Sequence, residues 1–156
     1  MEDWRGAQDL FESEAEALGD ADPERRREVW LRVGDIGRDH TGDLERALLA
    51  YTRAAEIRPL PATRKLEIAK LHQRCGHLDA HAEVLGQWCD DPDANASATD
   101  HTELATVLEG LDRPDAALER ARRALELERA FTPALDLQAK LLESREIGRA
   151  SCRERV

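Results

Sequence analysis

Residues 23–59 read PERRREVWLRVGDIGRDHTGDLERALLAYTRAAEIRP, and this stretch decides the fold. It holds two runs of apolar side chains at helical spacing, one before Gly42 and one after it. The first run is Val29, Trp30, Val33 and Ile36, and the second includes Leu44, Ala47, Leu48, Tyr51 and Ala54. Asp22 and Pro23 are typical of a helix start, and Pro59 ends the second helix. The stretch therefore predicts two amphipathic helices joined by a short turn.

Small residues repeat along the chain in two registers. One set lies about 35 residues apart inside successive apolar patterns, namely Gly34, Ala69, Ala105 and Ala139. The second set lies about two periods apart, with Ala47 matched by Ala117 and Ala54 matched by Ala124. Small side chains at these positions let paired helices approach closely. The two registers together predict an array of similar helix pairs.

The rest of the chain also favours helices. Further helical segments are expected at 3–18, 62–75, 78–89, 104–111, 117–125 and 132–144. Residues 94–100 are small and polar, and we expect them to form the longest loop. No segment alternates between apolar and polar residues as a strand would. The predicted fold class is all-α.

One family pattern is matched by these residues. The spacing Trp30-x2-Val33-Gly34 followed by Ala47-x3-Tyr51-x2-Ala54-x4-Pro59 resembles a tetratricopeptide repeat with one extra residue in its turn. Residues 104–124 resemble another repeat, whereas the unit between them departs from the pattern at His81 and Trp88, where Ala is expected. The resemblance implies an α-α superhelix, a solenoid of antiparallel helix pairs.

The resemblance divides the chain into units of one helix pair each. Residues 22–60 would be a first repeat, 61–93 a divergent repeat and 94–130 a third, preceded by the loop. Residues 1–21 would be a lone second helix, and 131–145 the first helix of an incomplete repeat. A repeat array normally ends in a polar capping helix, whereas this one would end in an incomplete repeat. We therefore expect the sequence to be a fragment of a longer array.

The last eleven residues are a separate case. Residues 146–156 read EIGRASCRERV, which resembles the translation of a common sequencing adapter followed by a stop codon. Under this interpretation the tail is not native, Cys152 carries no function, and the native residues are about 1–145. We expect the tail to be disordered.

Composition limits the possible partners. Acidic residues outnumber basic ones 33 to 23, and the net charge of -10 argues against a general nucleic-acid binder. No apolar run reaches the roughly 20 residues of a membrane helix, and the N-terminus does not resemble a signal peptide. Three cysteines are too few for a disulfide scaffold. We expect a cytoplasmic protein with neither nucleic acid nor membrane as partner.

One group of side chains has the composition of a metal site. His77 and His81 have the spacing of a zinc-binding pair on one helix face, and His72, Cys75 and Cys89 lie nearby in the sequence. A second short ligand pair is missing, so helix packing and solvated histidines are the favoured interpretation. No nucleophile, phosphate-loop or zinc-protease motif occurs. We therefore expect no catalysis, no cofactor and no bound metal.

The resemblance also places a binding surface. In tetratricopeptide proteins the first helix of each pair lines a concave groove, in which protein partners or extended peptides lie. The corresponding positions here are Leu31, Asp35, Arg38, Asp39, Leu66, Lys70, Gln73, Arg74, Thr102, Thr106 and Glu109. The family's clamp for C-terminal carboxylates uses Lys and Asn where Leu31 and Asp35 stand, which disfavours a chaperone-tail receptor.

Three functions follow from these observations. The first is a scaffold that binds a protein or peptide partner in its groove, without catalysis. The second is a regulatory or sensory segment of a larger bacterial enzyme, such as a Ser/Thr kinase. The third is a zinc-stabilised helical module built on the histidines and cysteines.

Overall fold

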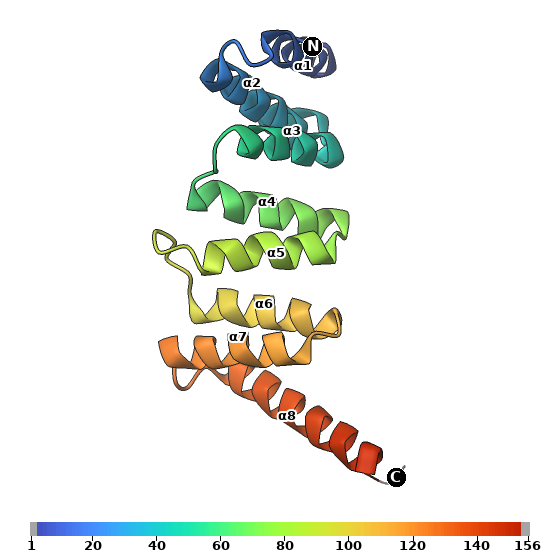
Figure 1. Ribbon diagram of the computed structural model, residues 1–156, viewed down its shortest axis with the longest axis vertical. Coiled ribbons are helices and arrows are strands. Elements are labelled where there is room, and N and C mark those ends of the chain that lie inside the picture. The colour runs from blue at the N-terminus through green and yellow to red at the C-terminus, as the bar shows by residue number, and fades with distance from the viewer. Residues whose placement is uncertain (1–2, 154–156) are drawn as a thin grey trace. The chain divides into compact units, whose positions relative to one another are not determined.

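A computed structural model describes residues 3–153 of the chain (Figure 1). The chain divides into two compact units, Met1–His77 and Leu78–Val156, called here the N-terminal and the C-terminal unit. Among the described residues the regular structure is helical throughout, without strands, so the all-α prediction is confirmed. Among the same residues, the helices are too short or too polar to cross a membrane.

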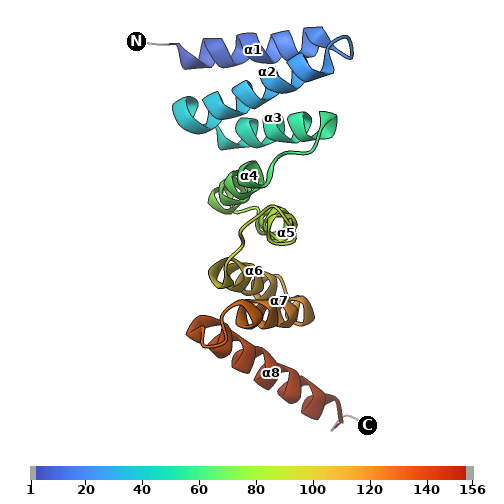
Figure 2. The ribbon, with the colours of Figure 1, turned by 90° about the vertical axis from the view of Figure 1, so that its left-hand side faces the viewer.

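The described part of the N-terminal unit contains four α-helices and one π-helical turn. Its elements are α1 (Trp4–Leu18), α2 (Pro23–Ile36), the π turn η1 (Gly37–Thr41), α3 (Leu44–Ile57) and α4 (Ala62–Cys75). Helix α2 packs against both α1 and α3, and consecutive helices run in opposite directions (Figure 2). The two helices expected from residues 23–59 are therefore present as α2 and α3.

Short acidic side chains start three of these helices. Asp3, Asp22 and Asp43 each precede a helix, and each carboxylate accepts a hydrogen bond from a backbone amide of the first turn at 2.9–3.1 Å. These bonds satisfy donors that have no partner within the helix. Gly42 and Gly76 have φ of +71° and +77°, and end the preceding elements in the left-handed conformation that glycine adopts most easily.

The extra residue of the predicted first repeat falls near the segment that forms the π turn η1. Gly37 begins this turn, and a Cβ there would lie 2.9 Å from Ala47 and 3.0 Å from the Gln8 amide nitrogen. Gln8 is buried in α1 and donates a hydrogen bond to the carbonyl of Val33, while Thr41 donates one to its side-chain oxygen. The turn is thus held on one side by α1 and on the other by α3.

The core of the N-terminal unit lies between these helices. The pattern positions Trp30, Val33, Ala47 and Ala54 are buried, as is the Tyr51 ring. The remaining buried apolar residues come from all four α-helices and the segment before α4, and include Ala15, Val29, Ile36, Leu48, Leu60, Ile68, Ala69 and Leu71. The core therefore follows the helical stripes expected from the sequence.

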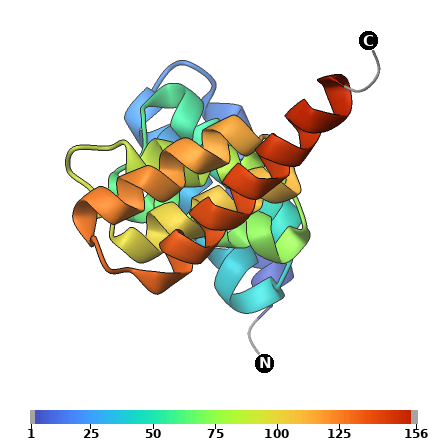
Figure 3. The ribbon, with the colours of Figure 1, turned by 90° about the horizontal axis from the view of Figure 1, so that it is seen from below.

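The C-terminal unit contains α5 (Leu78–Cys89), α6 (Ala98–Gly110), α7 (Pro114–Leu127) and α8 (Thr132–Arg153). Helices α6 and α7 form a closely packed antiparallel pair, and α8 crosses them before its last turns extend beyond α7 (Figures 1 and 3). Ala105, Ala117, Ala121 and Ala124 are fully buried at this pair, as small residues at close helix contacts should be.

The two residues that depart from the repeat pattern, His81 and Trp88, are both buried in α5. His81 is 1% exposed, and its Nε2 lies 3.6 Å from a Glu103 carboxylate oxygen of α6. Trp88 is also buried. Larger side chains are thus buried in α5 at positions where the repeat pattern expects alanine.

The expected loop at 94–100 is displaced in the structure, where the connection runs from 90 to 97. Helix α6 begins at Ala98 because Ser97 and Asp100 form a capping box. The Asp100 backbone amide donates to the Ser97 hydroxyl, and the Asp100 carboxylate accepts from the Ser97 amide. The residues between Cys89 and Ala98 connect α5 to α6.

The end of the last helix was predicted wrongly. We expected it to stop at 144 and the tail to be disordered, whereas α8 continues to Arg153. Glu, Arg and Ala are good helix formers, so a single glycine at 148 is tolerated within the helix. Residues 142–147 are exposed, and 154–156 lie outside the described residues. The non-native origin of the tail stays a prediction.

Candidate functional site

A pocket opens on the N-terminal unit between α1, α2, η1 and α4. Its volume is about 870 Å³, large enough for several residues of a peptide. Apolar and charged side chains both contribute to the wall, namely Trp4, Phe11, Arg25, Glu28, Val29, Leu31, Arg32, Asp35, Ile36, Asp39, His40 and Arg64. The pocket therefore offers apolar contact and charges of both signs.

Aromatic rings from α1 form the apolar part of the wall. The Trp4 indole stacks on the His40 imidazole of η1, with ring centroids 3.8 Å apart and planes within 9°. The Arg32 guanidinium lies 5.2 Å from the centroid of the Phe11 ring, within the range of a cation–π interaction. These contacts fix the face of α1 that lines the pocket against α2 and η1.

Asp35 anchors the charged part of the wall. Its Oδ1 accepts hydrogen bonds from the Tyr51 phenol at 2.7 Å and from Arg64 Nη1 at 2.6 Å. Burial, together with the bond to Asp35, raises the pKa of the Tyr51 phenol. The phenol is thus a donor at neutral pH, and α2 is tied to both α3 and α4 through one carboxylate.

Arg38 extends this network at the edge of the pocket. It forms two parallel hydrogen bonds with the Asp39 carboxylate, each 2.7 Å long, and a third of 2.9 Å with Glu67 of α4. The hydrogen bond to Asp39 raises the pKa of Arg38, and the same bond lowers that of Asp39. Arg64 also donates to Glu67, so the network is nearly balanced in charge.

The predicted groove positions of the N-terminal unit fall into two groups. Leu31, Asp35 and Asp39 line the pocket, and Arg38 contacts Asp39 beside it. The α4 positions do not line the pocket: Leu66 is half-buried, while Lys70, Gln73 and Arg74 are exposed. The pocket is thus lined by the expected groove positions of α2 and η1, and not by those of α4.

The predicted positions of the C-terminal unit lie on α6 and differ among themselves. Thr102 was expected to point outward but is buried, and its hydroxyl donates to the carbonyl of Ala98 in the same helix. Thr106 is exposed, whereas the Glu109 carboxylate pairs with Lys140 of α8 at 2.7 Å. The prediction for Thr102 was wrong because α6 is covered along the face that carries this residue.

Several pocket residues were missed from the sequence. Trp4 and Phe11 of α1 and Arg64 of α4 were not among the predicted groove positions. The other omissions are Arg25, Glu28, Val29, Arg32, Ile36 and His40. These residues all lie on α2 or beside it, facing α1. The aromatic residues of α1 were the sequence signal that could have revealed the pocket.

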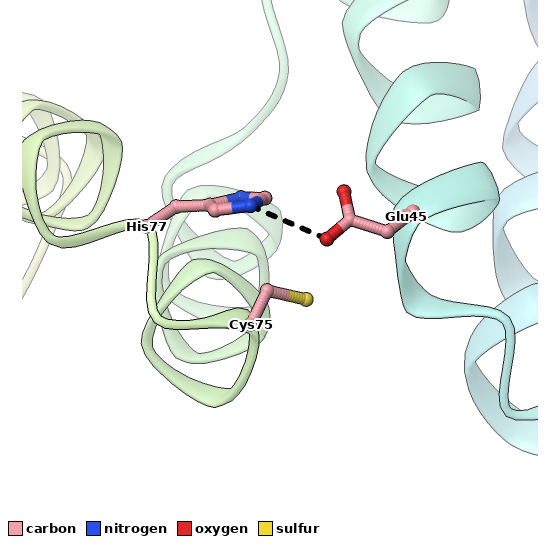
Figure 4. A group of neighbouring side chains, drawn as sticks. All are labelled: Glu45, Cys75 and His77. Atoms are coloured by element: carbon pink, nitrogen blue, oxygen red, sulfur yellow. Dashed lines mark ion pairs between the residues drawn. The ribbon is translucent and has the colours of Figure 1, made fainter.

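The structure does not bring the residues of the predicted metal site together as expected. His77 lies in the turn before α5 and not on that helix, so His77 and His81 do not form a pair on one helix face. His81 and Cys89 belong to the C-terminal unit, where burial raises the pKa of the Cys89 thiol to about 12. In the N-terminal unit, Glu45, Cys75 and His77 offer ligand atoms that all lie within 4.8 Å of one another (Figure 4).

Known structures share this helical arrangement. A crystal structure of the MamA protein aligns with a TM-score of 0.59 at 21% identity, over 76% of this chain and 63% of that one. The fold is that of tetratricopeptide repeat proteins. YrrB, described as a tetratricopeptide protein with an unusual peptide-binding site, aligns with a TM-score of 0.56 at 21% identity, over 76% of this chain and 60% of that one.

A second MamA structure aligns over more of its length. It covers 95% of this chain and 92% of that one, with a TM-score of 0.54 at 17% identity. The chain thus spans less than two thirds of the first two structures and nearly all of the third. At these identities the likeness concerns the fold. No family model matches the chain, and no curated protein matches its sequence.

Proposed function

We propose that this chain is a protein-interaction scaffold without catalytic activity, and that its N-terminal unit binds a short extended segment of a partner protein. The observation that carries the proposal is the pocket of about 870 Å³ with aromatic and charged walls. Peptide sites combine an apolar anchor with a few charged groups that fix orientation. The fold shared with the peptide-binding protein YrrB supports the same function.

The charges of the wall suggest which peptide would bind. Arg25 pairs with Glu14 at 2.9 Å and Arg64 with Asp35 at 2.6 Å, so both are already neutralised. Arg32 has no carboxylate partner among the described residues and lies over the Phe11 ring. A carboxylate of the ligand would find its strongest partner there. We therefore expect a peptide with an apolar side chain close to an Asp, a Glu or a free C-terminus.

Selection from a random peptide library displayed on phage tests the proposal. The full chain is the bait, and enriched peptides are synthesised and titrated by calorimetry. Leu31→Arg places a large cation in the pocket wall, whereas Leu49→Arg changes an exposed leucine of α3 outside the pocket. Circular dichroism of both variants shows whether the fold is kept.

The proposal predicts enriched peptides that carry an apolar residue near a carboxylate. Leu31→Arg should weaken their binding by at least about tenfold, which corresponds to about 1.4 kcal/mol, and Leu49→Arg should leave it unchanged. Failure to enrich any sequence, or equal binding by both variants, would contradict the pocket as the binding site.

A further inference from the structure

Three potential metal ligands meet at the junction of two helices in the N-terminal unit. Glu45 lies in the first turn of α3, Cys75 is the last residue of α4, and His77 follows the glycine that ends α4. The left-handed conformation of Gly76, with φ of +77°, turns the chain sharply enough that Cys75 and His77 approach Glu45 together (Figure 4). Residues from two helices and a turn thus converge on one point.

We propose that Glu45, Cys75 and His77 form a three-ligand site for Zn²⁺, with water at the fourth position. A thiolate, an imidazole and a carboxylate are the three ligand types that zinc accepts, and sites with three protein ligands and one water are well known. This proposal is independent of the peptide pocket, because Glu45, Cys75 and His77 do not line that pocket.

The distances are close to those of a zinc site. Tetrahedral coordination places ligand atoms about 3.4–3.6 Å apart, given metal–ligand bonds of roughly 2.0–2.3 Å. His77 Nε2 and Glu45 Oε1 are 3.2 Å apart, and every pair among the three ligand atoms lies within 4.8 Å. Closing the widest pair requires a shift of roughly 1 Å. Glu45 and His77 are exposed side chains that can rotate by this amount.

The charge balance also suits the divalent cation. Zinc binding replaces the Cys75 S–H bond by a Zn–S bond and releases the proton to solvent, while His77 coordinates as neutral imidazole. One thiolate and one carboxylate then neutralise the two charges of the ion. The Glu45 carboxylate pairs with the His77 ring, and its ligand oxygen lies within 4.8 Å of Cys75 Sγ, so the ligands are already gathered.

The fourth position is left to solvent by the surroundings. His72, whose ring centroid lies 5.7 Å from that of His77, is not among the residues whose ligand atoms meet here. Glu45 and His77 keep 66% and 42% of their side chains exposed, so water reaches the site. A bound ion would cross-link the start of α3 to the end of α4, which belong to successive helix pairs.

Cobalt titration of the full chain under reducing conditions tests the proposal, because Co²⁺ occupies zinc sites and a Co–thiolate bond absorbs in the near ultraviolet. The variants Cys75→Ser, His77→Ala and Glu45→Gln each remove one ligand. The controls are Cys89→Ser, a thiol of the other unit, and Glu56→Gln, an exposed carboxylate on α3. Zinc competition then gives the zinc affinity.

The proposal predicts one Co²⁺ bound per chain with a thiolate band that Zn²⁺ abolishes. Cys75→Ser should remove the band, and the other two ligand variants should lower the affinity by at least about tenfold. Zinc at about one hundred times its Kd should raise the Tm by about 5–10 °C in the unaltered chain and leave that of Cys75→Ser unchanged. Absence of the band, or a band lost in Cys89→Ser but kept in Cys75→Ser, would overturn the site.

Discussion

The ring of Tyr51 fills the space that a side chain on Gly34 would occupy. A Cβ built on Gly34 would lie 2.5 Å from the nearest ring carbon, closer than atoms of neighbouring side chains approach. Helices α2 and α3 therefore touch through a glycine and an aromatic ring. This contact explains why a glycine stands at 34, whereas alanine stands at the matching positions 69 and 105.

Gly34→Ala should destabilise the N-terminal unit by about 2–3 kcal/mol, because the added methyl group overpacks a contact without free space. Urea denaturation followed by tryptophan fluorescence measures the change. Gly110→Ala is the matched control, since a Cβ there meets nothing within 4 Å. It should be neutral or stabilise by up to about 1 kcal/mol. Equal effects of the two variants would show that α2 and α3 are less closely packed than described.

The hydrogen bond between Tyr51 and Asp35 should contribute measurably to stability. Tyr51→Phe removes the hydroxyl that donates to Asp35 at 2.7 Å. The free energy of unfolding should fall by about 1–2 kcal/mol. Asp35→Asn weakens the same bond and the pairing with Arg64. A double-mutant cycle of the two variants should give a coupling energy of about 1 kcal/mol. Additive effects would mean that the phenol and the carboxylate act independently.

The stability of the C-terminal unit should fall at acid pH through Asp90. Arg120 donates two hydrogen bonds to its carboxylate, at 2.5 and 2.7 Å, and these lower the pKa of Asp90. Such a group stabilises the folded state above its unfolded pKa of about 3.9 and loses that contribution as the pH falls through the lower folded value. Because the carboxylate is 61% exposed, we expect less than about 1 kcal/mol.

Denaturation across this pH range checks the assignment. Asp90→Asn should reduce the decline in unfolding free energy below about pH 4, whereas Asp93→Asn, at an exposed position in the same connection, should follow the unaltered chain. Identical acid profiles for Asp90→Asn and the unaltered chain would contradict the role of the ion pair.

Two adjacent leucines of α8 should lose different amounts of stability when they are truncated to alanine. Leu141 is 3% exposed, so Leu141→Ala should cost about 2–4 kcal/mol. Leu142 is 39% exposed, so Leu142→Ala should cost less than about 1 kcal/mol. Thermal denaturation followed by circular dichroism compares them. A larger loss for Leu142→Ala would mean that α8 packs through a different face.

The sequence predicted the fold well where periodicity decides it. The helical stripes and the small residues at Gly34, Ala105 and Ala117 identified the paired helices, because close helix contacts restrict side-chain size at a fixed spacing. The turn η1 was not predicted, although an extra residue was noticed, since an insertion can be absorbed by a loop or by a helix distortion. The Ser97–Asp100 capping box was a readable signal for the start of α6.

The candidate sites were less predictable because they depend on contacts between distant residues. Leu31, Asp35 and Asp39, expected from the repeat register to face a groove, line the pocket, but Arg64 joins Asp35 from another helix, across 29 residues of sequence. Glu45 likewise reaches Cys75 from 30 residues away, so local ligand spacing did not reveal it. Ala139 matched the repeat register but is exposed on α8.

Binding of a peptide in the pocket of the N-terminal unit can be measured at a single side chain, Trp4. The most direct measurement is two-dimensional NMR of the three indole N–H signals, from Trp4, Trp30 and Trp88, during titration of the full chain with a library-selected peptide. Trp4 lines the pocket, whereas Trp88 is buried in the other unit. We predict that the Trp4 signal shifts in a saturable manner while the Trp88 signal stays in place. A saturable shift of the Trp88 signal with an unmoved Trp4 signal would contradict peptide binding in this pocket.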